Sequence, residues 1–255
     1  MAKQRAYSLK SSYMTRILNT FVFGRQEDER IVKDWRDLES RTFEDYIQEA
    51  VRPYLGRTQT ELKELFHIDT SPKNLNELLF ARMLGVKGNL ARTEEFQNAN
   101  IVPKTIRVQQ NGKIKESMSF PPFRFRELVR ENWEESTLRN HLEPTKFLFI
   151  VFRQAGAEEY VFDHIKFWNM PAEDLEEVFR VWMRTVETIR RGVLLWHDGH
   201  CMRNDLPKQS QSPVAHVRPH AQNAMDTDTL PDGREMTKQC FWLNNSYVAQ
   251  QIGEG

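Results

Sequence analysis

The segments KFLFIVF (146–152) and YVFDHIKFW (160–168) decide the fold class that we expect for this chain. The first segment is apolar throughout, which is typical of a strand in the middle of a sheet, whereas the second alternates as a half-exposed strand does. An amphipathic helix follows from Pro171 to about Arg191, with acidic residues in its first turns and arginines at its end. The helix dipole favours this charge order. Two strands and a long helix therefore predict a sheet with helices packed against it.

Further strand-like segments lie on both sides of this pair. Residues 101–108 (IVPKTIRV) have the composition of a strand, and Asn111-Gly112 predicts a hairpin turn into a short strand that ends near Phe120. Towards the C-terminus, strands are predicted in PVAHVRP (213–219) and QCFWL (239–243), and loops at 203–213 and 222–237.

The first half of the chain is predicted to be mainly helical. Apolar residues recur at helical spacing in three segments, at 42–55, 60–67 and 74–84. Thr42 and Thr60 stand in N-cap position of the first two segments, and Gly85 ends the third. With a last helix at 244–252, the expected fold is α/β, a mixed central sheet flanked by helices.

Composition limits the classes of protein that the chain can be. Its 255 residues are enough for one large domain or two small ones, and 36 basic against 36 acidic residues give a formal net charge of zero. This balance argues against a chain-wide basic nucleic-acid binder. Two cysteines cannot form a disulfide framework, and no segment approaches the roughly 18 apolar residues of a membrane span. We therefore expect a cytoplasmic protein.

One stretch, EEFQNANIVPKTIRV (94–108), has part of a metal-site pattern. Metal-dependent nucleases of the restriction-enzyme class need an acidic residue followed by an acid-x-Lys pair on the next strand, because two carboxylates hold Mg²⁺ and the lysine acts near the scissile phosphate. Glu95 stands in place of the first acid and Lys104 in place of the lysine. Val102 occupies the second acid position and cannot bind a metal, so the motif is broken at its centre.

Around this motif the sequence resembles the MutH family. The resemblance rests on long ordered segments over roughly residues 70–252: EEFQNANIVPKTIRV, KESMSFPPF, NWEES, KFLFIVF, FWNMPAEDLEEV, HVRPHAQN and TKQCFWLNNSYV. The family includes a mismatch-repair nicking enzyme and GATC-specific type II restriction endonucleases with two MutH-like domains in tandem. The chain is most similar to the second, C-terminal domain of those restriction enzymes, and the resemblance implies a restriction-endonuclease-like fold.

The resemblance also implies a domain boundary near the N-terminus. The segments YSLKSSY (7–13) and FWLNNSY (241–247) share an aromatic-x-Leu-polar-polar-Ser-Tyr pattern, which chance alone could produce. The family match makes QRAYSLKSSYM (4–14) similar to the tail of a first MutH-like domain. We therefore expect residues 1–25 to be such a tail or a linker, and residues 26–255 to be the MutH-like domain.

Carried over by position, the family's catalytic residues are largely lost. Its aspartate corresponds to Glu95, its glutamate to Val102 and its lysine to Lys104, and a further acid on the preceding helix corresponds to Ala81. The resemblance therefore implies a degenerate active site that binds no metal, with Mg²⁺ needed only in the catalytic domain. The chain alone is then predicted not to be an enzyme, and Glu95 and Lys104 to be a surface ion pair or a relic.

The family's DNA-contact positions are better preserved. Its Arg-Pro-Lys-small loop, which enters the major groove, corresponds to Arg218-Pro219-His220-Ala221. A tyrosine near the end of the family sequence corresponds to Trp242, and a DNA-facing phenylalanine to Phe120. An arginine can donate two hydrogen bonds to a guanine, which discriminates by about 1–3 kcal/mol. The alternative to DNA contact is a structural role, with Arg218 capping a strand end and with Trp242 and Phe120 in the core.

Three functions follow from these expectations. The first is a GATC-binding regulatory domain of a type II restriction endonuclease, silent by itself, whose partners are double-stranded DNA and the N-terminal catalytic domain of the same enzyme. A dimer on DNA is one arrangement that the palindrome allows. The second is an active Mg²⁺-dependent endonuclease that cleaves at GATC. The third is a protein-interaction domain without DNA contact, and no membrane partner is expected.

Overall fold

The computed structural model describes residues 14, 18, 22, 29–114 and 117–253 of the chain. The predicted tail or linker at 1–25, and the repeat at 7–13 that suggested it, therefore lie almost entirely outside the described residues. The chain divides into two compact units, and neither unit is continuous in sequence. Unit 1 comprises Met1–Ile106 and Lys146–Phe167, and unit 2 comprises Arg107–Thr145 and Trp168–Gly255.

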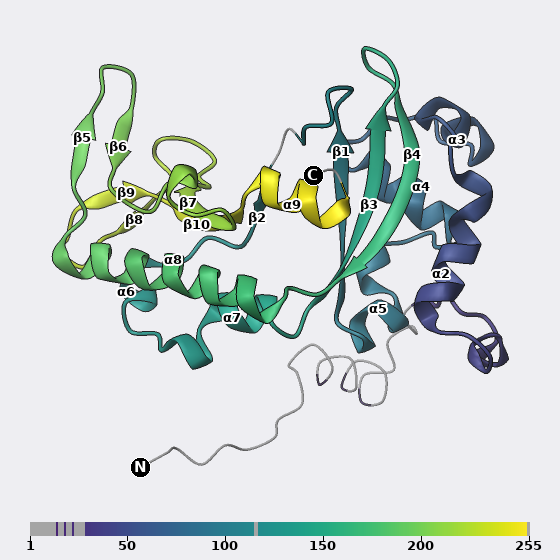
Figure 1. The fold of residues 1–255 in the computed structure, drawn as a ribbon, viewed down its shortest axis with the longest axis horizontal. Helices are drawn as coiled ribbons and strands as arrows, with labels where there is room; N and C mark the ends of the chain where they lie inside the picture. Colours follow the sequence, from purple (N-terminus) through teal and green to yellow (C-terminus); the bar gives the residue numbers. More distant parts are fainter. Residues whose placement is uncertain (1–13, 15–17, 19–21, 23–28, 115–116, 254–255) are drawn as a thin grey trace. The chain divides into compact units, whose positions relative to one another are not determined.

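Unit 1 is a three-stranded sheet with helices from the first half of the chain (Figure 1). Its elements in chain order are η2 (Trp35–Leu38), α2 (Phe43–Val51), η3 (Arg52–Tyr54), α3 (Gln59–Leu65), α4 (Leu75–Met83), η4 (Leu90–Arg92), α5 (Glu94–Asn98), β1 (Ile101–Val108), β3 (Lys146–Gln154) and β4 (Tyr160–Trp168). The strand order is β1-β3-β4, so β3 is central. Residues 147–152 are fully buried, which explains why this strand is apolar on both faces.

Local signals set the helix ends in unit 1. Thr42 caps α2 with a capping box that Asp45 completes, as its position predicts. The second helix begins two residues earlier than predicted, because Thr58 is its N-cap, whereas the Thr60 hydroxyl donates to Glu159 across unit 1. Gly85, with a φ of +69°, ends α4 as expected.

Unit 2 consists of a second three-stranded sheet, two short ribbons and the helices around them. Its elements are β2 (Met118–Ser119), α6 (Phe125–Leu128), η5 (Trp133–Glu135), α7 (Thr137–Leu142), α8 (Ala172–Arg191), β5 (Leu195–His197), β6 (Met202–Asn204), η6 (Gln209–Gln211), β7 (Ala215–Pro219), β8 (Thr227–Thr229), β9 (Glu235–Thr237), β10 (Gln239–Leu243) and α9 (Asn245–Ile252). The strand β10 is central, antiparallel to β2 on one side and to β7 on the other. No described helix is long and apolar enough to cross a membrane.

The α/β class is confirmed, and the structure adds detail that the sequence pattern did not reveal. The strands are distributed over two sheets and two ribbons. Both segments predicted as loops contain structure, because 203–213 includes the end of β6 and η6, and 222–237 includes the ribbon β8–β9. These strands have three residues each, and three residues are too few for an alternating pattern to appear.

Candidate nucleic-acid interface

The predicted loop Arg218-Pro219-His220-Ala221 begins at the end of β7, next to Trp242 on β10. The Arg218 guanidinium lies over the indole of Trp242, with 4.5 Å between its Cζ atom and the ring centroid. The indole N–H donates to the Arg218 carbonyl at 3.4 Å. No acidic side chain pairs with Arg218 among the described residues. The aromatic ring therefore holds one face of an exposed guanidinium, and its N–H edge is available to a ligand.

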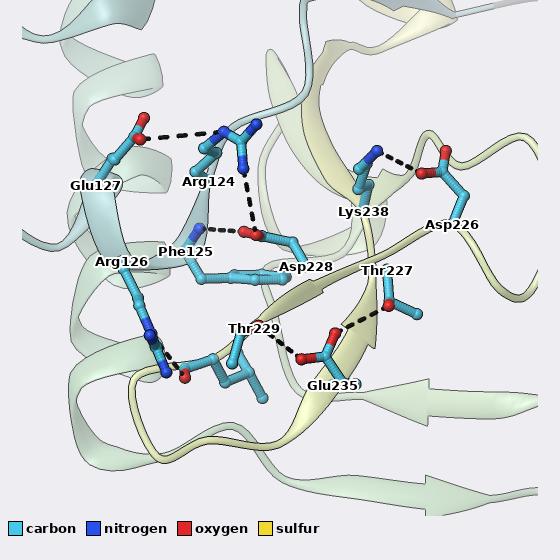
Figure 2. Close-up of polar contacts among 11 residues, drawn as sticks. Arg124, Phe125, Arg126, Glu127, Asp226, Thr227, Asp228, Thr229, Glu235 and Lys238 are labelled. Atoms are coloured by element: carbon cyan, nitrogen blue, oxygen red, sulfur yellow. Dashed lines mark hydrogen bonds and ion pairs between the residues drawn. The ribbon is translucent and has the colours of Figure 1, made fainter.

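The rest of the loop is fixed by backbone and carboxylate contacts. The His220 ring meets the Trp242 ring edge-on at 5.4 Å between centroids, and its backbone N–H donates to the Lys238 carbonyl at 2.9 Å. Asp226 accepts from the backbone N–H of Gln222 at 3.0 Å and forms an ion pair with Lys238 (Figure 2). The contact with Lys238 lowers the pKa of Asp226 most, and the hydrogen bond from Gln222 lowers it further. Asp226 therefore links the residues that follow His220 to Lys238.

The ribbon that follows the loop is anchored in the same way (Figure 2). The hydroxyls of Thr229 and Thr227 donate to the Glu235 carboxylate at 2.6 and 2.9 Å, and these bonds lower the pKa of Glu235. Asp228 accepts from the backbone N–H of Phe125 at the start of α6, at 2.9 Å. The ribbon thus connects the Arg218 loop to α6, whose first residue lies 103 positions before Asp228 in the sequence.

A buried polar pair lies on the same face of the sheet as Arg218. His216 is two residues before Arg218 on β7, and its Nδ1 lies 2.6 Å from Oδ1 of Asn244. Asn244 in turn donates from Nδ2 to the Ser212 carbonyl, so His216 must donate from Nδ1. Burial lowers the pKa of His216, and the Arg218 charge adds to this effect. The sequence analysis did not single out His216, although its position two residues before Arg218 is a signal for it, since side chains two apart on a strand point the same way.

Cys240, the cross-strand neighbour of Arg218, is fully buried. Burial raises the pKa of its thiol to about 12, so this cysteine is an inert core residue.

Phe120 is not part of this exposed surface. Its side chain is 5% exposed and meets the ring of His141 edge-on. It lines a partly enclosed apolar pocket of about 200 Å³ together with Phe123, Leu128 and Phe241. This placement favours the core alternative for Phe120 over direct contact with DNA.

The altered metal-site motif lies in unit 1, where α5 leads into β1. Glu95 accepts hydrogen bonds from the backbone N–H groups of Ile31 and Val32, at distances of 2.8 to 3.1 Å. Its carboxylate forms no ion pair with Lys104, so the predicted surface pair is wrong. Glu95 instead holds the segment that precedes η2.

The other positions of the motif do not complete a metal site. Val102 and Ala81 offer no ligand atoms, and Ala81 is buried in the core of unit 1. Burial lowers the pKa of the Lys104 ammonium, and the Glu77 carboxylate partly offsets this change. No group of three or more His, Cys, Asp or Glu side chains in the described ranges could hold a metal ion. The described residues at this motif therefore do not fit a carboxylate-bound Mg²⁺.

Comparison with known proteins relates the chain to an enzyme that acts on DNA. No protein-family model matches it. The chain is 36% identical over 290 aligned residues to the type II restriction enzyme Sau3AI of Staphylococcus aureus. The alignment covers 98% of this chain and 59% of Sau3AI, so the chain spans about three fifths of the length of that relative. The α/β architecture is consistent with a restriction-endonuclease-like fold.

This comparison corrects one expectation. The broken acid pattern predicted that the chain by itself is not an enzyme, yet a restriction enzyme matches nearly all of its residues. Loss of ligands at one motif was therefore too narrow a basis for excluding an enzyme, because the similarity to a restriction enzyme extends over nearly the whole chain.

Proposed function

We propose that this chain functions in a type II restriction endonuclease that cleaves double-stranded DNA at GATC, and that the surface around Arg218 recognises the site. The similarity to Sau3AI over 98% of the chain carries the proposal for the enzyme class. The exposed guanidinium stacked on Trp242, with no acidic partner among the described residues, supports the proposal for recognition. A guanidinium held in this way can donate both of its edge N–H groups to O6 and N7 of one guanine.

Cleavage is tested with the purified chain and two supercoiled plasmids, one with GATC sites and one without. We expect cleavage of the first plasmid only, in reaction buffer that contains Mg²⁺. Absence of cleavage at every enzyme concentration would reject an endonuclease activity of this chain on its own.

A second candidate function is that of the DNA-reading, regulatory part of such an enzyme. It is favoured by Glu95, whose carboxylate is engaged by backbone N–H groups, and by the apolar residues Val102 and Ala81. Binding without cleavage supports this function, and binding to GATC and scrambled duplexes with equal affinity contradicts site recognition in either function. The partners then include the rest of the enzyme as well as DNA.

A further inference from the structure

A second cation–aromatic pair lies at the base of the hairpin formed by β5 and β6, which extends away from the end of α8 (Figure 1). The Lys208 Nζ lies 5.5 Å from the ring centroid of Trp196. Both side chains are exposed, and Trp196 retains 42% of its surface. An exposed ring is not informative by itself, since single apolar side chains on a surface are normal, but this ring lies under a lysine ammonium group.

The pair is connected to the Arg218 surface through the backbone. The Val217 N–H donates to the Pro207 carbonyl at 2.8 Å, which holds the segment after β6 alongside β7. Lys208 directly follows Pro207, and Arg218 directly follows Val217. Two exposed cations, each lying over a tryptophan ring, therefore flank one hydrogen bond within unit 2.

The charge balance around the hairpin distinguishes Lys208 from its basic neighbours. Arg203 is neutralised by Asp198 at 2.5 Å, and Arg191 by Asp205 at 2.7 Å. No acidic side chain pairs with Lys208 in the described parts of the chain. Because Arg191 and Arg203 are paired internally, Lys208 is a cation close to this hairpin that is available to an external anion.

We propose that Lys208, positioned by Trp196, binds a phosphate group of the DNA strand beside the bases that Arg218 recognises. This inference rests on the proposed function, because it requires duplex DNA on the Arg218 surface. An ammonium group contributes a point charge that neutralises a phosphate and releases counterions, without reading the sequence. The indole restricts a flexible lysine side chain before binding, which reduces the entropy lost when the contact forms. The pair thus extends the contact surface along the DNA backbone.

The test compares Lys208→Gln with Arg180→Gln, which removes an exposed positive charge from α8 of the same unit. Fluorescence anisotropy titrations use a GATC duplex and a scrambled duplex at several salt concentrations. We expect K208Q to bind both duplexes about 5-fold more weakly, with the slope of log affinity against log salt reduced by about 0.9. We expect R180Q to match the wild type, and Trp196→Phe, which keeps an aromatic ring, to lose less affinity than Trp196→Ala.

The outcomes separate this inference from the proposed function. If the wild type binds neither duplex, the proposed function fails. If the wild type prefers GATC but K208Q retains the wild-type affinity and salt slope, the phosphate contact is overturned. A change in the ratio of the two affinities would overturn it as well, because a phosphate contact affects both duplexes equally. Lys208→Arg keeps the charge and must retain the slope, which separates lost charge from misfolding.

Discussion

The segment from α5 to β1 and the neighbouring strands β7 and β10 both carry charged residues that the sequence marked as candidates, and these residues have opposite surroundings in the structure. On α5, the Glu95 carboxylate accepts from the backbone N–H groups of Ile31 and Val32, and on β1 Lys104 is partly buried. At the end of β7, Arg218 lies exposed over the ring of Trp242 on β10. A charged group satisfied internally stabilises the fold, whereas an exposed group that is held in place without a partner is prepared for a ligand. The difference lies in the partners of each side chain, and residue type alone does not reveal it.

The largest effect that we expect comes from removing the Glu95 carboxylate. Glu95→Ala leaves the N–H groups of Ile31 and Val32 without their acceptor, which should lower the free energy of unfolding by about 2–3 kcal/mol. Urea denaturation measures the change. Glu94→Ala is the matched control, since Glu94 pairs with Arg30 at the surface and should cost no more than about 1 kcal/mol.

The Glu95→Ala variant also tests whether Glu95 has the structural role that distinguishes it from Arg218. If Glu95→Ala unfolds at the wild-type urea concentration but abolishes Mg²⁺-dependent cleavage, the carboxylate is catalytic and its structural role is rejected.

Removal of the Arg218 guanidinium should have the next largest effect. Arg218→Ala is expected to reduce the preference for GATC over scrambled duplex by about 5–150-fold, which corresponds to 1–3 kcal/mol, with an unchanged melting temperature. Competitive binding titrations measure the ratio. Arg218→Lys keeps the charge but not the paired N–H groups and should recover affinity without preference. A lower melting temperature in both variants would instead indicate that Arg218 acts in the fold.

A smaller effect is expected when the aromatic ring under Arg218 is replaced by a smaller one. Trp242→Phe keeps an aromatic face but removes the N–H that donates to the Arg218 carbonyl. We expect affinity for the GATC duplex to fall by about 2–5-fold, equivalent to roughly 0.5–1 kcal/mol of cation–π interaction. Isothermal calorimetry is the suitable measurement. Wild-type affinity in this variant would show that the stacking does not orient Arg218.

The smallest effect that we expect is on the pH dependence of stability. Burial lowers the pKa of His216 in the folded state, so the stabilising effect of the neutral imidazole is complete above about pH 6.5 and is lost as the pH falls below that value. Urea midpoints from about pH 8 to about pH 5 should therefore decline more steeply for the wild type than for His216→Asn. Parallel curves for the two proteins would show that His216 does not couple stability to pH.

The sequence predicted much of the local structure because short-range signals dominate there. The apolar run at 146–152, the capping threonine Thr42 and the glycine after α4 each specify a local conformation, and each is confirmed. Thr60 failed as a cap because Thr58 has the same chemistry two residues earlier, and only the fold brings Thr60 to Glu159. The ribbon β8–β9 was missed since its strands are too short for a pattern.

The sequence by itself determined the α/β class, because apolar patterns and helix-end signals are local to the chain, and its resemblance to the MutH family predicted Arg218-Pro219-His220-Ala221 as the DNA-contact loop. The tertiary structure decided which candidates are exposed and which are satisfied. It stacks Arg218 on Trp242 and buries Phe120, and its Glu95 carboxylate accepts hydrogen bonds from the backbone N–H groups of residues 31 and 32. It also brought Lys208 beside the Arg218 strand through a single backbone hydrogen bond. These are contacts between residues far apart in sequence, and no local pattern encodes them, because they form only when separate segments pack together.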